Sequence, residues 1–184
     1  MTREKFEGLA FFAGFIACIP LANWMIGNVG TFCVPDGPCL LPVAPGLMAP
    51  SGVLLIGLAL VLRDLVQRRL GKKRAIAAIV VGAALSALIA PAALVTASTV
   101  AFLLSELADF AVYTPLQAKR LITAVVASSA VGLVIDSIVF LYLAFGSLDY
   151  VAGQVVGKGW MVLLAIPVIW FLRERDKRLG FVSA

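Results

Sequence analysis

Long apolar runs, separated by short clusters of charged or turn-forming residues, follow one another along the chain. A transmembrane helix needs about 20 mostly apolar residues, and six runs come close enough to that length to meet the demand. These runs are residues 7–26, 46–63, 75–91, 94–115, 121–145 and 154–172. The third and fourth are separated only by the segment APAAL, in which Pro91 cannot continue a helix. We therefore predict an all-α integral membrane protein, in which residues 1–184 form a single domain of six transmembrane helices.

The composition strengthens this prediction and excludes several functions. The 184 residues are 62% hydrophobic and 14% charged, whereas about a quarter of the residues in a soluble domain are charged. The first apolar run continues to Met25 without a signal-peptide cleavage site, so we interpret it as a retained span. Histidine, the commonest metal ligand and general base, is absent, and the three cysteines do not form a metal-binding cluster. We expect no metal, no cofactor and no enzymatic activity.

The basic residues predict the orientation in the membrane, because lysine and arginine gather in cytoplasmic segments. With the N-terminus inside, 14 of the 15 basic residues are cytoplasmic, and the outer connections contain none. Both termini are then cytoplasmic in a multi-pass protein of a bacterial inner membrane. The net charge of +5 is explained by these membrane-flanking residues and does not indicate a nucleic-acid partner. The exception is Lys158, inside the sixth span, which either snorkels to the outer headgroups or serves a function.

Four ionisable residues lie within the predicted spans: Glu106, Asp109, Asp136 and Lys158. At a rise of about 1.5 Å per residue, they lie roughly 15 to 24 Å from the inner basic anchors. Such groups are costly in a membrane and usually face a bundle interior or a watery cavity. Their shared depth therefore predicts one common polar site.

The spacing of these residues places them on defined helix faces. One face of the fourth span carries Phe102, Glu106, Asp109 and Tyr113. One face of the fifth span carries Ser129, Gly132, Asp136 and Phe140. Carboxylates, hydroxyl groups and aromatic rings on facing helices are typical of a site for a small, polar, aromatic ligand.

The balance of charge in the spans suggests which acids contact a ligand. Asp136 and Lys158 lie at similar depth and either form a structural ion pair or organise the site. Three acids against one base leave two carboxylates without a cation, so we expect Glu106 and Asp109 to accept hydrogen bonds from the ligand. The Watson–Crick edge of a guanine-like base, which presents adjacent N–H donors, would suit them.

The inner end of the second span carries further charges. Asp64 lies beside Arg63 and Arg68 in the segment VLRDLVQRRLGKKRA. This arrangement is either a cytoplasmic gate or a solvated charge cluster on a short loop. The position of the segment at the predicted end of the span favours the solvated cluster.

The first outer connection contains five prolines and is predicted to be structured. Cys33 and Cys39 flank the turn sequence VPDGP on the oxidising side of the membrane, which favours a disulfide over two free thiols. The prolines and glycines of residues 45–52 indicate either an interrupted second helix or an ordinary cap at its outer end.

Several of these segments together resemble a known family. The segments APSGVLLIGLALVLRDLVQRRLG, AFLLSELADFAVYTPL, GLVIDSIVFLYLAFGS and AGQVVGKGWMVL are similar to the vitamin-uptake-transporter (VUT) family of queuosine precursor transporters. The resemblance implies six helices and the uptake of 7-deazaguanines, chiefly 7-cyano-7-deazaguanine (preQ0), with preQ1 as a second candidate. The resemblance adds Ser105, Ser137 and Gln154 to the candidate site. The flat base would stack on the aromatic side chain of Phe102, Tyr113, Phe140 or Trp160.

We therefore predict a membrane transporter that imports a queuosine precursor, with Glu106 and Asp109 accepting hydrogen bonds from the base. The main alternative is the substrate-binding S-component of an energy-coupling-factor vitamin importer, which would need an ATPase module as partner. An intramembrane enzyme using the two acids, or a purely structural membrane protein, are further alternatives. The lipid bilayer surrounds the protein in every case, and glycine-rich spans permit a homodimer.

Overall fold

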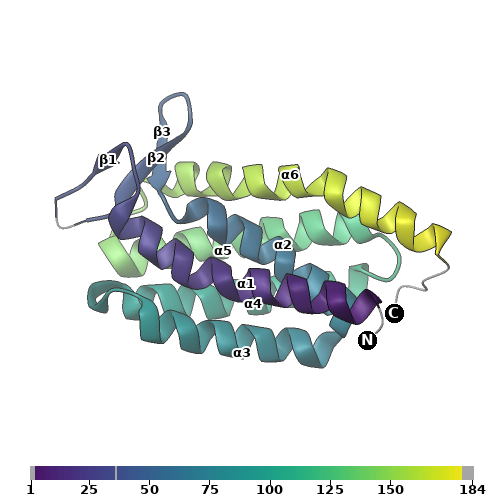
Figure 1. Ribbon diagram of the computed structural model, residues 1–184. Coiled ribbons are helices and arrows are strands. Elements are labelled where there is room, and N and C mark those ends of the chain that lie inside the picture. Colours follow the sequence, from purple (N-terminus) through teal and green to yellow (C-terminus); the bar gives the residue numbers. More distant parts are fainter. Residues whose placement is uncertain (1–2, 36, 180–184) are drawn as a thin grey trace.

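A computed structural model describes residues 3–35 and 37–179 and contains six long helices and a small sheet. The helices are α1 (Arg3–Asn28), α2 (Val53–Leu70), α3 (Lys72–Ile89), α4 (Val95–Leu116), α5 (Leu121–Phe145) and α6 (Val151–Arg178). They lie side by side in a bundle, with the start of α1 and the end of α6 at the same end (Figure 1). The helical prediction is confirmed, and the sheet is an addition to it.

Four of the helices are long and apolar enough to cross a membrane: α1, α4, α5 and α6. The other two, α2 and α3, have 18 residues each and both contain more than two charged residues. The finding is therefore a multi-pass membrane protein with four such helices in the described part of the chain. Six spans and the orientation of the termini remain predictions, and residues 1–2 and 180–184 lie outside the described residues.

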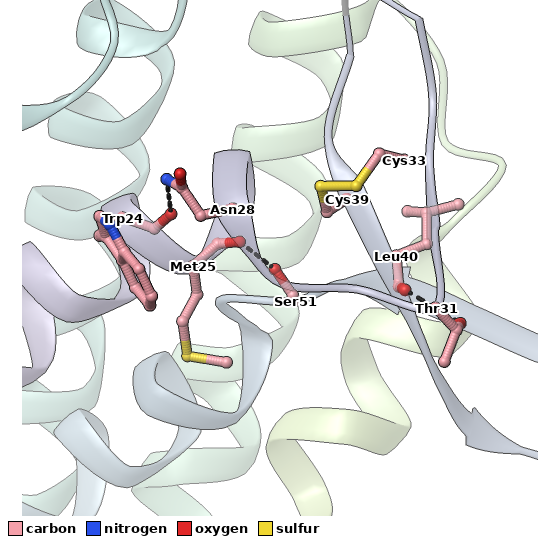
Figure 2. The surroundings of a disulfide bond; sticks show 8 residues. All are labelled: Trp24, Met25, Asn28, Thr31, Cys33, Cys39, Leu40 and Ser51. Carbon is pink, nitrogen blue, oxygen red and sulfur yellow. Dashed lines mark hydrogen bonds between the residues drawn. A yellow bond between two sulfur atoms is a disulfide. The ribbon is translucent and has the colours of Figure 1, made fainter.

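The connection between α1 and α2 forms an antiparallel sheet at the end of the bundle opposite the start of α1 (Figure 1). Its strands are β1 (Phe32–Cys33), β2 (Cys39–Ala44) and β3 (Leu47–Pro50), in the order β1-β2-β3. Cys33 and Cys39 are directly opposite in the β1–β2 register and are joined by a disulfide, as Figure 2 shows. The disulfide prediction thus agrees with the structure; Asp36 of the predicted turn lies outside the described residues.

The sheet corrects the predicted start of the second helix. Residues 46–52, expected to open that span, form the β2–β3 turn, strand β3 and the turn into α2, which begins at Val53. The prolines explain the difference, since proline lacks the N–H that a helix interior requires. The Ser51 hydroxyl donates a hydrogen bond of 2.7 Å to the Met25 carbonyl and ties the strand exit to α1 (Figure 2). Neither an interrupted helix nor a simple cap describes this segment.

The remaining connections are short and agree closely with the sequence pattern. Helix α3 ends at Ile89, and a 3-10 turn over Ala92–Leu94 leads into α4 directly after Pro91. Helix α5 has the predicted bounds, Leu121–Phe145. The tightest neighbours are α4 with α5 and α1 with α2, and α2 also packs on α6.

Helices α2 and α6 approach each other closely at Gly57. A Cβ atom added to Gly57 would lie 2.7 Å from both Cα and the carbonyl oxygen of Lys158, which are backbone atoms and cannot turn aside. We expect Gly57→Ala to lower the free energy of unfolding by about 1–3 kcal/mol, because the two helices must separate. Gly159→Ala is the matched control, since nothing lies within 4 Å of its Cβ position.

Thermal and denaturant unfolding in detergent micelles would compare the two variants. Gly159→Ala should be neutral or slightly stabilising, because alanine favours the helix. Equal stability of the two variants would contradict the close crossing of α2 and α6.

Candidate functional site

A cleft lies inside the bundle at the end that carries strands β1, β2 and β3, which we call the hairpin end. All six helices contribute to its walls. It encloses about 510 Å³ of empty space, a figure that includes its open mouth. Its polar lining residues are Asn23, Ser86, Ser98, Asp136, Gln154 and Lys158. The remaining walls are mostly apolar and include Phe102 and Phe140. A mostly apolar cleft with a few convergent polar groups is typical of a small-molecule site.

An ion pair between α5 and α6 forms the charged part of this cleft. Nζ of Lys158 lies 2.6 Å from Oδ2 of Asp136 and donates a hydrogen bond of 2.8 Å to Oγ of Ser137. A third hydrogen bond runs from the same amine to Oε1 of Gln154. Lys158 is only 1% exposed, so it does not snorkel to a headgroup region, and its three donors are all used.

Asp136 is the member of the pair that faces the open space. Its side chain is 10% exposed against 1% for Lys158, and the atom that contacts Lys158 is its Oδ2. A carboxylate oxygen held in place by a buried lysine is a fixed acceptor for an N–H donor of a ligand.

A second cluster of charges lies deeper in the bundle and is centred on Arg63 of α2. Its Nε lies 3.0 Å from Oε2 of Glu106, its Nη1 lies 2.9 Å from Oδ1 of Asp64, and its Nη2 pairs with Asp109. The side chains of all four residues are at most 2% exposed. We call these residues, Arg63, Asp64, Glu106 and Asp109, the inner cluster.

Neutral side chains complete the inner cluster. Gln67 accepts a hydrogen bond of 3.2 Å from Nη1 of Arg63 and donates one of 3.0 Å to Thr114 of α4. Ser128 of α5 donates to Oδ2 of Asp64 at 2.9 Å. Helices α2, α4 and α5 are therefore joined by polar contacts at this depth.

The inner cluster overturns two expectations. Glu106 and Asp109 do not lack a cation, because Arg63 pairs with both, and neither residue lines the cleft. Arg63 and Asp64 do not form a solvated cluster on a loop, because both are 0% exposed inside α2. The physical cause is that α2 runs from Val53 to Leu70, so it continues seven residues beyond Arg63, where the predicted span ended.

The other predicted site residues divide between the cleft and its surroundings. Phe102, Asp136, Phe140, Gln154 and Lys158 line the cleft. Ser105 is buried and donates to the backbone carbonyl of Phe102, while Tyr113 packs its ring 5.7 Å from Cζ of Arg63.

Trp160 lies elsewhere. It is 48% exposed on the surface of α6, and its indole N–H donates to the carbonyl of Val43 in β2. It does not line the cleft, since it lies only two residues from Lys158 and therefore points to a different side of the helix.

Sequence reasoning missed Arg63 as a site residue, although a signal was present. The segment LALVLRDLV has apolar residues on both sides of its Arg–Asp pair, which suggests a buried position rather than the end of a span. Because nearly all the other basic residues fall at predicted cytoplasmic ends of spans, Arg63 was assigned to such an end as well.

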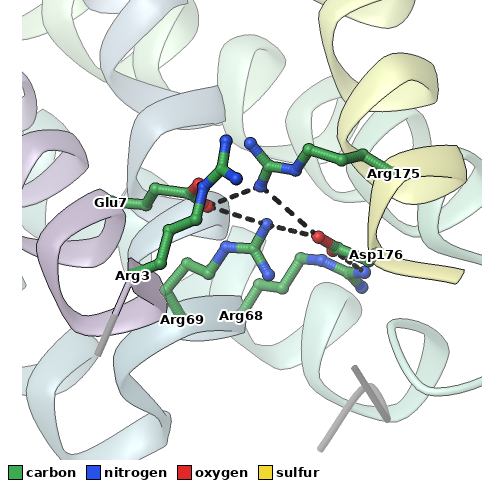
Figure 3. Close-up of polar contacts among 6 residues, drawn as sticks. All are labelled: Arg3, Glu7, Arg68, Arg69, Arg175 and Asp176. Carbon is green, nitrogen blue, oxygen red and sulfur yellow. Dashed lines mark hydrogen bonds and ion pairs between the residues drawn. The ribbon is translucent and has the colours of Figure 1, made fainter. Parts of the chain in front are cut away.

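A third group of charges closes the end of the bundle where α1 begins and α6 ends. Asp176 of α6 pairs with Arg68 and Arg69 of α2, each at 2.8 Å. Glu7 of α1 pairs with Arg69 at 3.1 Å and with Arg175 at 2.7 Å, as Figure 3 shows. We call this set the end network; it links α1, α2 and α6 on the opposite side of the inner cluster from the cleft.

Comparison with known proteins gives one match. Residues 90–172 match the family described as "Putative vitamin uptake transporter". The matched segment includes α4, α5 and most of α6, and so contains Phe102, Asp136 and Lys158. Neither a curated protein nor a solved structure matches the chain.

Proposed function

We propose that the chain imports a 7-deazaguanine precursor of queuosine. The match of residues 90–172 to the family described as "Putative vitamin uptake transporter" supports the uptake of a small molecule. The substrate is preQ0, with preQ1 as the second candidate. The observation that carries the proposal is the cleft at the hairpin end, which is lined by the carboxylate of Asp136 together with the aromatic side chains of Phe102 and Phe140.

The chemistry of a 7-deazaguanine suits these groups. Its pyrimidine edge carries adjacent N–H donors, which the Oδ1 atom of Asp136 would accept. Its flat bicyclic ring would pack against the aromatic side chains of Phe102 and Phe140. Gln154, whose Oε1 is taken by Lys158, would donate from its amide nitrogen to an acceptor on the base.

The cleft, the inner cluster and the end network follow one another along the bundle, and this order suggests how the substrate passes through it. The cleft lies toward the hairpin, while the end network holds α1, α2 and α6 together at the other end. If the hairpin is on the outer side, as the basic residues predict, the conformation is open outward and closed inward. Breaking the end network would then open the cytoplasmic side.

A thermal-shift measurement with purified protein tests the ligand class without assuming a coupling mechanism. We expect preQ0 at 100 times its dissociation constant to stabilise the protein by about 2.7 kcal/mol. Guanine and queuine should stabilise it less at the same concentration, and preQ1 is the informative comparison. No shift with preQ0 or preQ1 would contradict the proposed substrate.

Transport in proteoliposomes distinguishes the proposal from the main alternative. A transporter that acts alone moves labelled preQ0 in vesicles containing only this chain. An S-component of an energy-coupling-factor importer would bind preQ0 but require an ATPase module to move it, and would co-purify with that module from cells. The same preparation, analysed by mass photometry, reports whether the chain is a homodimer.

A further inference from the structure

The inner cluster carries more negative charge than positive charge. Three carboxyl groups surround one guanidinium group, and the four side chains are at most 2% exposed. If all were ionised, three negative charges and one positive charge would leave a net charge of −2. Uncompensated buried charge is costly, and a buried carboxylate avoids this cost by taking up a proton. The cluster is therefore a place where a proton is held.

The contacts within the cluster indicate which groups hold it. Asp64 and Asp109 are held at the same guanidinium group, since Nη1 of Arg63 pairs with Asp64 and Nη2 pairs with Asp109; we call these two residues the acidic pair. Two carboxyl groups held close to one cation repel each other less when one of them takes up a proton, as in acidic pairs that share one proton. Among the described residues, Oδ1 of Asp64 and Oδ2 of Asp109 are buried and have no hydrogen-bond partner, apart from the ion pair of Asp64 with Arg63.

Helices α4 and α5 also carry two buried hydroxyl groups, those of Tyr113 and Ser129, that have no hydrogen-bond partner among the described residues. In the chain, Tyr113 is one helical turn from Asp109 on α4, and Ser129 follows Ser128, which donates to Asp64. Both side chains are 0% exposed. An unpartnered buried hydroxyl is costly, but it can accept and pass on a proton when one is available.

The remaining charges that face the cluster do not balance it. Arg63 is shared among all three acids, and Asp136 is neutralised by Lys158 in the cleft. Arg68, on the next turn of α2, pairs with Asp176 in the end network.

The cluster and the cleft are built on the same helices. On α4, Glu106 is one turn from Phe102 of the cleft wall. On α5, Gly132 is one turn from Asp136, and a Cβ at Gly132 would lie 3.2 Å from Oδ2 of Asp109. A shift of α4 or α5 on substrate binding would therefore change the environment of the acidic pair.

We propose that the Asp64–Asp109 pair binds a proton that is carried inward together with the substrate, so that uptake is proton-coupled symport. This inference rests on the proposed function for the identity of the substrate, but not for the proton site. When the acidic pair is open to the outer side, one carboxylate oxygen gains a proton from water; when it is open to the cytoplasmic side, the same O–H bond breaks and water there accepts the proton. Arg63 and Glu106 stay paired throughout and keep the helices together.

Infrared spectroscopy of the purified full chain tests the proton site without any substrate. A protonated carboxylic acid has a C=O stretching band that a carboxylate lacks. We expect this band in the wild-type protein at pH 7, and its loss in both Asp64→Asn and Asp109→Asn. Asp149→Asn, in the exposed outer connection, is the control and should leave the band unchanged. Absence of the band in wild type, or its persistence in both inner-cluster variants, would overturn the proton site.

Proteoliposomes loaded with a pH-sensitive dye test the coupling. We expect external preQ0 to acidify the lumen, and an inside-alkaline gradient of one pH unit to raise preQ0 accumulation by up to about tenfold for one coupled proton. Asp109→Asn should retain the thermal shift with preQ0 but lose both effects. Uptake driven by a sodium gradient would overturn proton-coupled symport. So would preQ0 flux without acidification of the vesicle lumen. Failure of preQ0 to bind at all would instead contradict the substrate, and the infrared band would still decide the proton site.

Discussion

Replacing Arg63 by methionine should lower the free energy of unfolding by about 3–5 kcal/mol, which is the usual effect of removing one partner from a buried ion pair. Arg63 is 0% exposed and pairs with three acids from two helices. Methionine fills much of the same volume but leaves three carboxyl groups in a dry environment without a cation. Denaturant titration in detergent micelles would measure the loss.

Two further variants separate charge from packing. Arg74→Met removes an exposed arginine from the start of α3 and should change the free energy of unfolding by less than about 0.5 kcal/mol. Adding Glu106→Gln to Arg63→Met restores the original net charge of the cluster, so the double variant should be more stable than the sum of the single changes predicts. An Arg63→Met protein as stable as Arg74→Met would contradict the central role of Arg63.

Replacing Asp136 by asparagine should weaken preQ0 binding by at least about 30-fold and reduce uptake accordingly, since losing one member of a buried charged hydrogen-bond pair costs 2 kcal/mol or more. The change removes the acceptor that faces the cleft and places an amide of the same size beside Lys158. Isothermal titration with preQ0, together with uptake in proteoliposomes, would give the effect on each step.

A structural role for Asp136 predicts a different result. In that case Asp136→Asn would lower the unfolding temperature while the remaining folded protein bound preQ0 normally. Adding Lys158→Met removes the unpaired amine and should recover stability without recovering binding. Asp149→Asn, which removes an exposed acid near the same end of the bundle, should affect neither property. Normal preQ0 affinity in Asp136→Asn would contradict its role in the cleft.

Much of the fold follows from local patterns in the sequence. The bounds of α5 agree with prediction because an uninterrupted apolar run ends at Gly146, which adopts a positive φ of 63° that favours glycine. The predicted inward face of α4 is buried because residues three and four positions apart share one side of a helix. Cys33 and Cys39 pair because the intervening turn brings two short strands into register.

The site was only partly predictable, because local patterns describe spacing along one helix and not the contacts between helices. Spacing along a helix identified Asp136, Phe102 and Phe140 as inward-facing residues, but it could not identify the cation nearest to each acid. Arg63 is 43 residues from Glu106 and 46 from Asp109 in the chain, so their contact depends on how α2 packs against α4. The predicted span ended at Arg63, whereas α2 continues to Leu70, and this seven-residue error in the end of the helix hid the interior position of Arg63.

The sequence by itself determined the apolar helices, the inward faces of α4 and α5 and the cysteine pair, because these depend on hydrophobicity and spacing over a few residues. Only the tertiary structure decided that Asp136 faces an open cleft while Glu106 and Asp109 are sealed around Arg63. Charges in a membrane interior must find partners, and which partner each one finds depends on the packing of helices that are distant in the chain.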